Sequence, residues 1–236
     1  MNMMRFTTMK TKLRKYPSIF LILLLAISSC FLTGCVNQHP KDSKKISQGE
    51  SVETMLEITD PKEKQAVLNA KAKVKALSGN PRIVATSPAV ADICDKLDLD
   101  LVGVPKSSVS KIPSRYKKVK KVGLAMSPDM EIVSSLNPDW ILAPSSLETD
   151  LKPKFEELKN TEYAFLNLRS VQGMYRSVQE LGEIFGKQQE AEKMTKEFTT
   201  FYKSYTKRNK NKKHPKVLVL MGLPGSYVIA TENSYV

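Results

Sequence analysis

The chain has 236 residues, of which 41% are hydrophobic and 7% aromatic, so it can build a core and is not wholly disordered. Lys and Arg number 37 against 24 acidic residues, and the formal net charge of +13 is compatible with nucleic-acid binding, although part of this charge lies in an N-terminal segment that is predicted to be removed. Three cysteines are too few for a disulfide-rich secreted scaffold, and the length allows one domain or two small ones.

The N-terminus has the pattern of a secretory signal. Residues 1–16 are basic and carry no acid, and an apolar run at 19–27 follows that is too short for a comfortable membrane-spanning helix. Leu32-Thr33-Gly34-Cys35 then resembles the lipobox of bacterial lipoproteins. We predict a signal peptide over 1–34 and a mature chain that is acylated on Cys35 with palmitate-type chains, on the extracellular face of the cell membrane. The alternatives are a plain signal peptide with an unrelated cysteine and an uncleaved anchor.

Residues 35–80 are predicted to form a tether and a stalk helix. Positions 36–59 are rich in Lys, Ser, Gln and Glu, which suits a solvated tether. In the sequence from Asp60 to Glu63, Asp is a helix N-cap and the following proline suits the first helical position. The apolar face of this helix is weak, so we expect it either in the stalk or lightly packed on the domain.

Residues 81–170 are predicted to form an N-terminal α/β lobe. Short apolar strands alternate there with helices of about ten residues, which indicates a mostly parallel sheet flanked by helices. Such sheets bind ligands at the carboxyl ends of their strands. Cys94 shares a helical apolar face with Val90 and Leu97, so we expect it in the core. The predicted strands are 82–86, 101–105, 121–123, 139–144 and 163–168. The predicted helices are 88–97, a helix that residues 127–129 cap and that runs to about 136, and 150–159.

The alternation then ends. Residues 171–214 carry a nearly continuous helical pattern and predict a long backbone helix, with a candidate break near Gly186. The basic cluster at its end has no interleaved aromatic residues, so on an exported chain we expect anionic lipid or polymer near it and no nucleic acid. Residues 215–236 contain two apolar strands, 217–222 and 227–231, and are predicted to begin a C-terminal lobe that stays incomplete.

This order of segments resembles the substrate-binding lipoproteins of ABC importers for metal chelates. In that family two lobes joined by a helix clamp haem, a ferric siderophore or cobalamin. Four stretches are similar to the haem receptors of the iron-regulated surface determinant importers of Gram-positive bacteria. The resemblance implies that haem is the cargo, that an ABC permease and its ATPase receive it, and that haem-donating surface proteins act upstream. The four stretches are 82–84, 97–103, 122–131 and 216–227.

Met126 is the residue that the resemblance singles out, as an axial ligand of haem iron. A neutral thioether ligand raises the reduction potential of haem, as in cytochromes. The alternative is that Met126 fills a gap in the core. Haem-binding relatives supply the opposite ligand as a His of the second lobe, and neither His39 nor His214 matches that position.

Weaker candidates line the same predicted cleft. Thr86, Ser87 and Ala89 lie where a strand ends and a helix begins, so their N–H groups suit a haem propionate, unless Ser or Thr simply caps that helix. Ser226 and Tyr227 would face the cleft from the second lobe.

Two acids match the positions at which relatives dock with arginines of the permease. These are Glu131 in the first lobe and Glu232 in the second. The alternative for Glu131 is a helix N-terminal acid that the macrodipole favours.

Three alternatives to a haem receptor are an enzyme, a receptor for another cargo and a non-functional fragment. The sequence has no Gly-rich phosphate loop, no Gly-x-Ser-x-Gly elbow and no cluster of His and Cys at metal spacing, so we expect no enzyme. A siderophore or corrinoid is the alternative cargo, for which no thioether ligand is needed. A non-functional truncated fragment is the third alternative, because the second lobe has only begun when the sequence ends.

Overall fold

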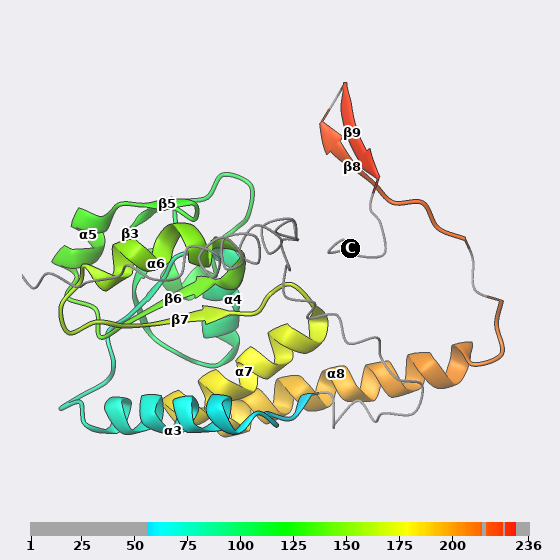
Figure 1. Cartoon of the computed structure of the whole chain (residues 1–236), viewed down its shortest axis with the longest axis horizontal. Coiled ribbons are helices and arrows are strands. Elements are labelled where there is room, and N and C mark those ends of the chain that lie inside the picture. Colours follow the sequence, from blue (N-terminus) through cyan, green and yellow to red (C-terminus); the bar gives the residue numbers. More distant parts are fainter. Residues whose placement is uncertain (1–55, 214–215, 224, 230–236) are drawn as a thin grey trace, which may run out of the picture. The chain divides into compact units, whose positions relative to one another are not determined.

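The computed structural model describes residues 56–213, 216–223 and 225–229 (Figure 1). The chain divides into two compact units, Met1–Lys45 and Ile46–Val236, and every described element belongs to the second. The predicted signal peptide, Cys35, Glu232, His39 and His214 lie outside the described residues.

Five parallel strands form the central sheet, in the order β3-β2-β1-β6-β7. The predicted parallel sheet is therefore confirmed. The chain moves from β1 through β2 to β3 on one side and through β6 to β7 on the other, so the strand order reverses between β1 and β6. Doubly wound sheets place their ligand crevice at that reversal, outside the carboxyl ends of the strands. The strands are β1 Ile83–Ala85, β2 Leu101–Val104, β3 Lys120–Lys121, β6 Trp140–Pro144 and β7 Glu162–Leu166.

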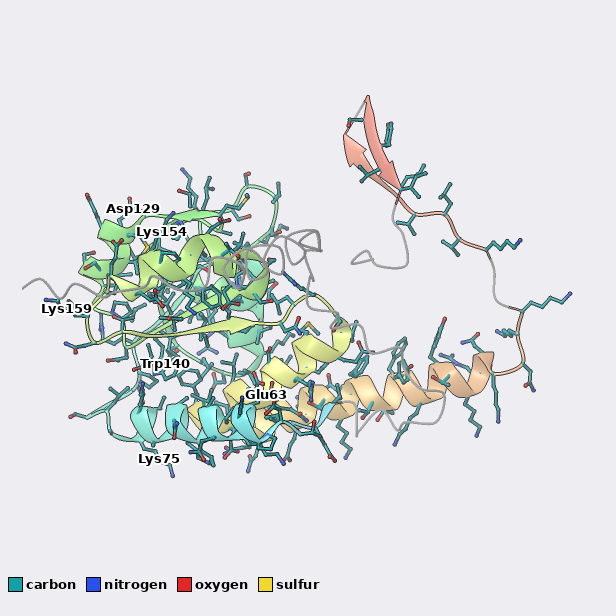
Figure 2. All side chains as sticks on the ribbon, in the orientation of Figure 1. Glu63, Lys75, Asp129, Trp140, Lys154 and Lys159 are labelled. Carbon is teal, nitrogen blue, oxygen red and sulfur yellow. The ribbon has the colours of Figure 1, made fainter. Side chains whose placement is uncertain are left out.

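Helices cover both faces of the sheet, because neighbouring residues of each buried strand point to opposite sides. Ile83 and Leu142 join a core cluster with α4 and α7, whereas Val84 and Ile141 join a second cluster with α5 and α6. Trp140 belongs to the first cluster, and its ring meets Phe185 edge to face at 5.5 Å (Figure 2). The flanking helices are α4 Pro88–Lys96, α5 Met130–Ser135, α6 Glu148–Glu156 and α7 Val171–Phe185, and two 3-10 turns are η1 Ser114–Tyr116 and η2 Ser145–Leu147.

Helix α3, Pro61–Lys75, begins as the sequence predicts. The Lys62 N–H donates to Asp60 Oδ1 at 2.7 Å, so Asp60 is the N-cap. The helix packs on α7 (Figure 1). Val67 is buried in the first core cluster, and Lys71 forms an ion pair with Glu183. Of the two placements considered for this helix, the structure shows packing on the domain.

The predicted long helix is interrupted at its candidate break, because the chain reverses at Gly186. That residue takes a left-handed conformation with φ +70° and caps α7, and α8, Gln188–Asn209, begins two residues later. The two helices then lie side by side: Tyr175 stacks on Phe198 with their ring centroids 4.5 Å apart. They approach closely near Gly182, where a Cβ would lie 2.6 Å from the Cβ of Ala191.

The last described strands form a separate two-stranded hairpin. β8, Leu220–Leu223, pairs antiparallel with β9, Ser226–Ile229, so both predicted strands are present, but each is shorter than predicted and has shifted bounds. The boundaries given above for the tether, the two lobes and the helical segment between them remain predictions.

Candidate functional site

A small antiparallel hairpin carries Met126 at its turn. β4, Gly123–Leu124, pairs with β5, Ser127–Pro128, and Ala125 and Met126 connect the two strands. The strand predicted over 121–123 is therefore wrong at its end, because β3 stops at Lys121 and Gly123 starts the hairpin.

Gly123 makes this hairpin possible. Its φ is +94°, and an added Cβ would lie 2.8 Å from the backbone nitrogen of Asp129. The N–H of Lys106 donates to the carbonyl of Gly123 at 2.6 Å, and the N–H of Asp129 donates to the carbonyl of Val122 at 2.7 Å. Since the Val122 side chain is fully buried, the base of the hairpin is fixed to the core.

The Met126 side chain projects from this fixed base and is 74% exposed. Leu124 in the same hairpin is 58% exposed. The alternative of Met126 as a core gap-filler is therefore wrong. An exposed thioether on an anchored turn is accessible to a ligand, and its role as an iron ligand stays a prediction.

The turn between β1 and α4 lies where the strand order reverses. The Thr86 N–H donates to the carbonyl of Leu142 at 3.0 Å, and the Thr86 hydroxyl lies 3.3 Å from the same oxygen. Ser87 Oγ accepts from the N–H of Val90 at 3.2 Å and is the N-cap of α4. Both side chains are buried. The capping alternative is confirmed for Ser87.

These bonds limit what the turn offers an anion. The N–H of Ala91 donates to the carbonyl of Ser87 at 3.0 Å, and Pro88 has no N–H. The donors that remain in this described turn are the N–H groups of Ser87 and Ala89, and Ala89 is exposed. A propionate would thus be bound by backbone groups, because neither hydroxyl faces solvent.

Glu131 lies in the first turn of α5, which Asp129 caps through a 3.1 Å bond from the N–H of Ile132 (Figure 2). The Glu131 side chain is exposed and follows the Met126 hairpin directly. Both interpretations of this acid, permease docking and dipole compensation, fit that position.

The remaining predicted site residues lie elsewhere. Ser226 and Tyr227 begin β9, where they pair with Leu223 and Gly222, and Tyr227 is 66% exposed. Cys94 is a core residue as predicted, and burial raises the pKa of its thiol to about 12. The described residues contain no cluster of three or more acidic, His or Cys side chains that suits a metal ion.

Sequence reasoning missed a pair of carboxyl groups between α3 and α7. Glu63 lies on α3 (Figure 2). Burial of Glu180, then its hydrogen bond with Glu63 and the charge of Glu63, raise the pKa of Glu180 to about 8. The charge of Arg176 lowers the pKa of Glu180. Arg176 also donates a hydrogen bond to the carbonyl of Glu57 at 2.7 Å. No signal in the sequence joins residues so far apart in the chain.

A cavity of about 420 Å³ lies on this same side, between α3, α7 and the start of α8. Apolar side chains such as Val67 and Ala191 line it together with charged ones such as Lys64 and Glu192. None of the residues predicted to bind ligand lines it. Within the described part of the chain, no helix is long and apolar enough to cross a membrane.

Comparison with known proteins identifies the relatives of this fold. The chain is 39% identical over 160 residues to the high-affinity heme uptake system protein IsdE of Staphylococcus aureus, which covers 67% of this chain and 54% of that protein. The chain thus spans about half the length of the curated relatives it matches. The sequence profile of the periplasmic binding protein family matches residues 83–236.

Two solved structures agree with this assignment. An ABC transporter substrate-binding protein from Listeria monocytogenes EGD-e is 44% identical, with a TM-score of 0.61 over 66% of this chain and 60% of that one. S. aureus IsdE complexed with heme is 37% identical, with a TM-score of 0.60 over the same shares. The resemblance seen in the sequence is confirmed, and the chain belongs to the periplasmic binding protein family.

Proposed function

We propose that this protein captures haem outside the cell and delivers it to an ABC permease for iron acquisition. The observation that carries the proposal is the exposed Met126 thioether on a fixed hairpin beside the carboxyl edge of a parallel sheet. One relative, IsdE of S. aureus, is named as a heme uptake protein and has a solved structure complexed with heme, and this supports the same cargo.

Different groups of the protein hold different parts of the haem in this proposal. Met126 supplies a neutral sulfur ligand to the haem iron, which favours the low-spin state and a raised reduction potential. The backbone N–H groups of Ser87 and Ala89 receive a propionate, whose charge the start of α4 favours. Ser226 and Tyr227 contribute from the opposite side of the cleft. No covalent chemistry is required of the protein, because capture and release are binding steps.

Delivery requires a membrane partner. We assign Glu131 and Glu232 to docking with basic side chains of the permease, and Cys35 to the lipid anchor that keeps the protein on the extracellular face of the membrane. The ATPase of the importer and the haem-donating surface proteins are the further partners in this scheme. Glu131 is exposed one turn beyond the hairpin, so a permease that contacts it lies next to the haem site.

The cargo class is tested by equilibrium titration of residues 46–236, which contain the whole described fold in one compact unit. Haem, a ferric siderophore and cobalamin are added separately, and binding is followed by absorbance and by quenching of Trp140. We expect haem to bind saturably and the siderophore and cobalamin not to bind. Tighter binding of the siderophore or of cobalamin would replace haem with that cargo.

A further inference from the structure

Six lysines follow the β3 edge of the sheet, and we call them the lysine strip. Residues 101–128 contain no acidic residue. The one arginine of this segment, Arg115, is neutralised by Asp98 and Asp100, each 2.8 Å away. Among the described residues no ion pair involves any of the six lysines. The strip consists of Lys106, Lys111, Lys117, Lys118, Lys120 and Lys121.

Five lysines of the strip are placed along this edge, and the sixth, Lys111, lies in the loop between β2 and η1. β3 is the last strand on its side of the sheet, Lys120 and Lys121 form it, and Lys117 and Lys118 precede it. The backbone bond from Lys106 to Gly123 places Lys106 beyond the carboxyl end of the same strand. All six side chains are exposed except Lys121, which is half-buried. An array of positive charge therefore runs from the amino end of the edge to the carboxyl end.

Protection of the sheet edge does not account for the strip. Lysines on an edge strand prevent pairing with another chain, and this explains Lys120 and Lys121. The other four lysines lie outside the strand, where they protect no unpaired backbone groups of β3.

Binding of a partner protein also does not account for the lysine strip. Such interfaces are depleted in Lys and depend on aromatic or Arg anchors. The aromatic side chain of this segment, Tyr116, is buried and its hydroxyl donates to the carbonyl of Leu99. Arg115 is occupied by its carboxylates. Diffuse attraction to a charged surface needs no such anchors.

One apolar side chain projects among the cations. Val109 is 93% exposed in the loop between Lys106 and Lys111. A small apolar group surrounded by lysines suits the boundary between lipid headgroups and acyl chains. The same loop reaches the carboxyl edge, where Met126 lies.

We propose that the lysine strip binds the headgroups of anionic phospholipids and lays this edge of the lobe on the membrane. Each lysine near such a surface contributes roughly a fivefold gain in partitioning. This contact is additional to the proposed anchor at Cys35 and does not depend on haem binding. It would fix the orientation of the carboxyl edge relative to the membrane.

The test is flotation of residues 46–236 with vesicles of phosphatidylglycerol and phosphatidylcholine, or of phosphatidylcholine alone. This unit lacks both the apolar N-terminal run and Cys35, so neither contributes to binding. The strip variant is Lys117→Glu, Lys118→Glu and Lys120→Glu. The control variant makes the same change of charge at exposed lysines of α6 and α8, as Lys152→Glu, Lys193→Glu and Lys196→Glu, and circular dichroism checks the fold of both.

We expect the unaltered unit to prefer phosphatidylglycerol, the strip variant to partition at least tenfold less, and the control to lose less than threefold. Val109→Ser, made in the otherwise unaltered unit, leaves the net charge unchanged and should also weaken binding to phosphatidylglycerol vesicles, because it removes the exposed apolar side chain. Equal losses in the two charge variants would reduce the effect to net charge and overturn the proposal. So would a failure of the unaltered unit to distinguish the two kinds of vesicle.

Discussion

The backbone N–H of Lys106 donates to the carbonyl of Gly123 at 2.6 Å, and this bond joins the loop after β2 to the hairpin that carries Met126. The thioether is exposed, but the backbone that positions it is held by the sheet. Because this backbone is already ordered, ligand binding at Met126 costs less conformational entropy than binding at a methionine on a free loop.

Gly123→Ala tests whether that positioning depends on glycine. The added Cβ would meet the Asp129 backbone at 2.8 Å in a conformation with φ +94°. We expect a loss of about 1–3 kcal/mol in the free energy of unfolding, measured by urea denaturation, and weaker haem binding. Gly79→Ala is the control, because nothing lies within 4 Å of its Cβ position. Equal stability of the two variants would contradict the account of the hairpin.

Ser87→Ala separates the two roles considered for the β1–α4 turn. Loss of the cap should lower the free energy of unfolding by about 1 kcal/mol, because the Val90 N–H loses its acceptor. Haem affinity should change less than threefold, since the proposed propionate donors are backbone groups. Ser170→Ala, which removes the cap of α7 instead, gives the matched stability change away from the turn. A tenfold loss of haem affinity in Ser87→Ala alone would assign the hydroxyl to the ligand.

Glu180 should make stability fall as pH rises. Its pKa is about 8 in the folded protein against an ordinary value of 4.5, so between these values the folded state binds more protons than the unfolded state. The free energy of unfolding should then decrease from about pH 4.5 to pH 8, by up to about 1.4 kcal/mol per pH unit. Urea denaturation from pH 5.5 to 8.5 measures this slope.

Glu180→Gln should flatten that slope, because the amide keeps a hydrogen bond to Glu63 and does not titrate. Glu183→Gln is the control on the same helix. The pKa of Glu183 is lowered, first by its bond with Lys71, so its contribution is lost only as pH falls below the range measured. A slope that survives in Glu180→Gln would remove this carboxyl from the account.

Much of the lobe follows from local pattern. The strands near 83, 101, 140 and 162, the cap at Ser87 and the burial of Cys94 all depend on apolar spacing and on residues a few positions apart. These short-range preferences agree with the final packing, so the sequence alone predicts them.

Other features depend on contacts between distant segments. The reversal after α7 needs both the left-handed Gly186 and the close approach of Gly182 to Ala191. The sequence marks a candidate break near Gly186 but does not show that the chain turns back there. The Glu63–Glu180 pair exists only after α3 packs on α7. The exposure of Met126 likewise depends on how the backbone turns at Gly123. The residue types around a methionine do not show which way the chain turns, so the sequence does not predict this exposure.

Glu131→Lys tests docking with the permease. We expect haem affinity to be unchanged within about threefold, while haem-dependent growth of a complemented strain falls sharply, because charge reversal at a rim contact slows association. Glu148→Lys is the matched control, since Glu148 is an exposed acid in the first turn of α6. If both variants support growth equally, Glu131 has only a helix-terminal role.

The most direct test of the central claim is the absorbance spectrum of residues 46–236 during haem titration, beside Met126→Leu. Leucine keeps the size and apolar character of the side chain and removes the sulfur. Met130→Leu, at a half-buried Met packed on the second core cluster, is the control. We predict a Soret shift that saturates at one haem per chain, with a low-spin spectrum that disappears in Met126→Leu and persists in Met130→Leu. An identical spectrum in both variants, or no saturable shift in the unaltered protein, would contradict the assignment of Met126 as the haem ligand.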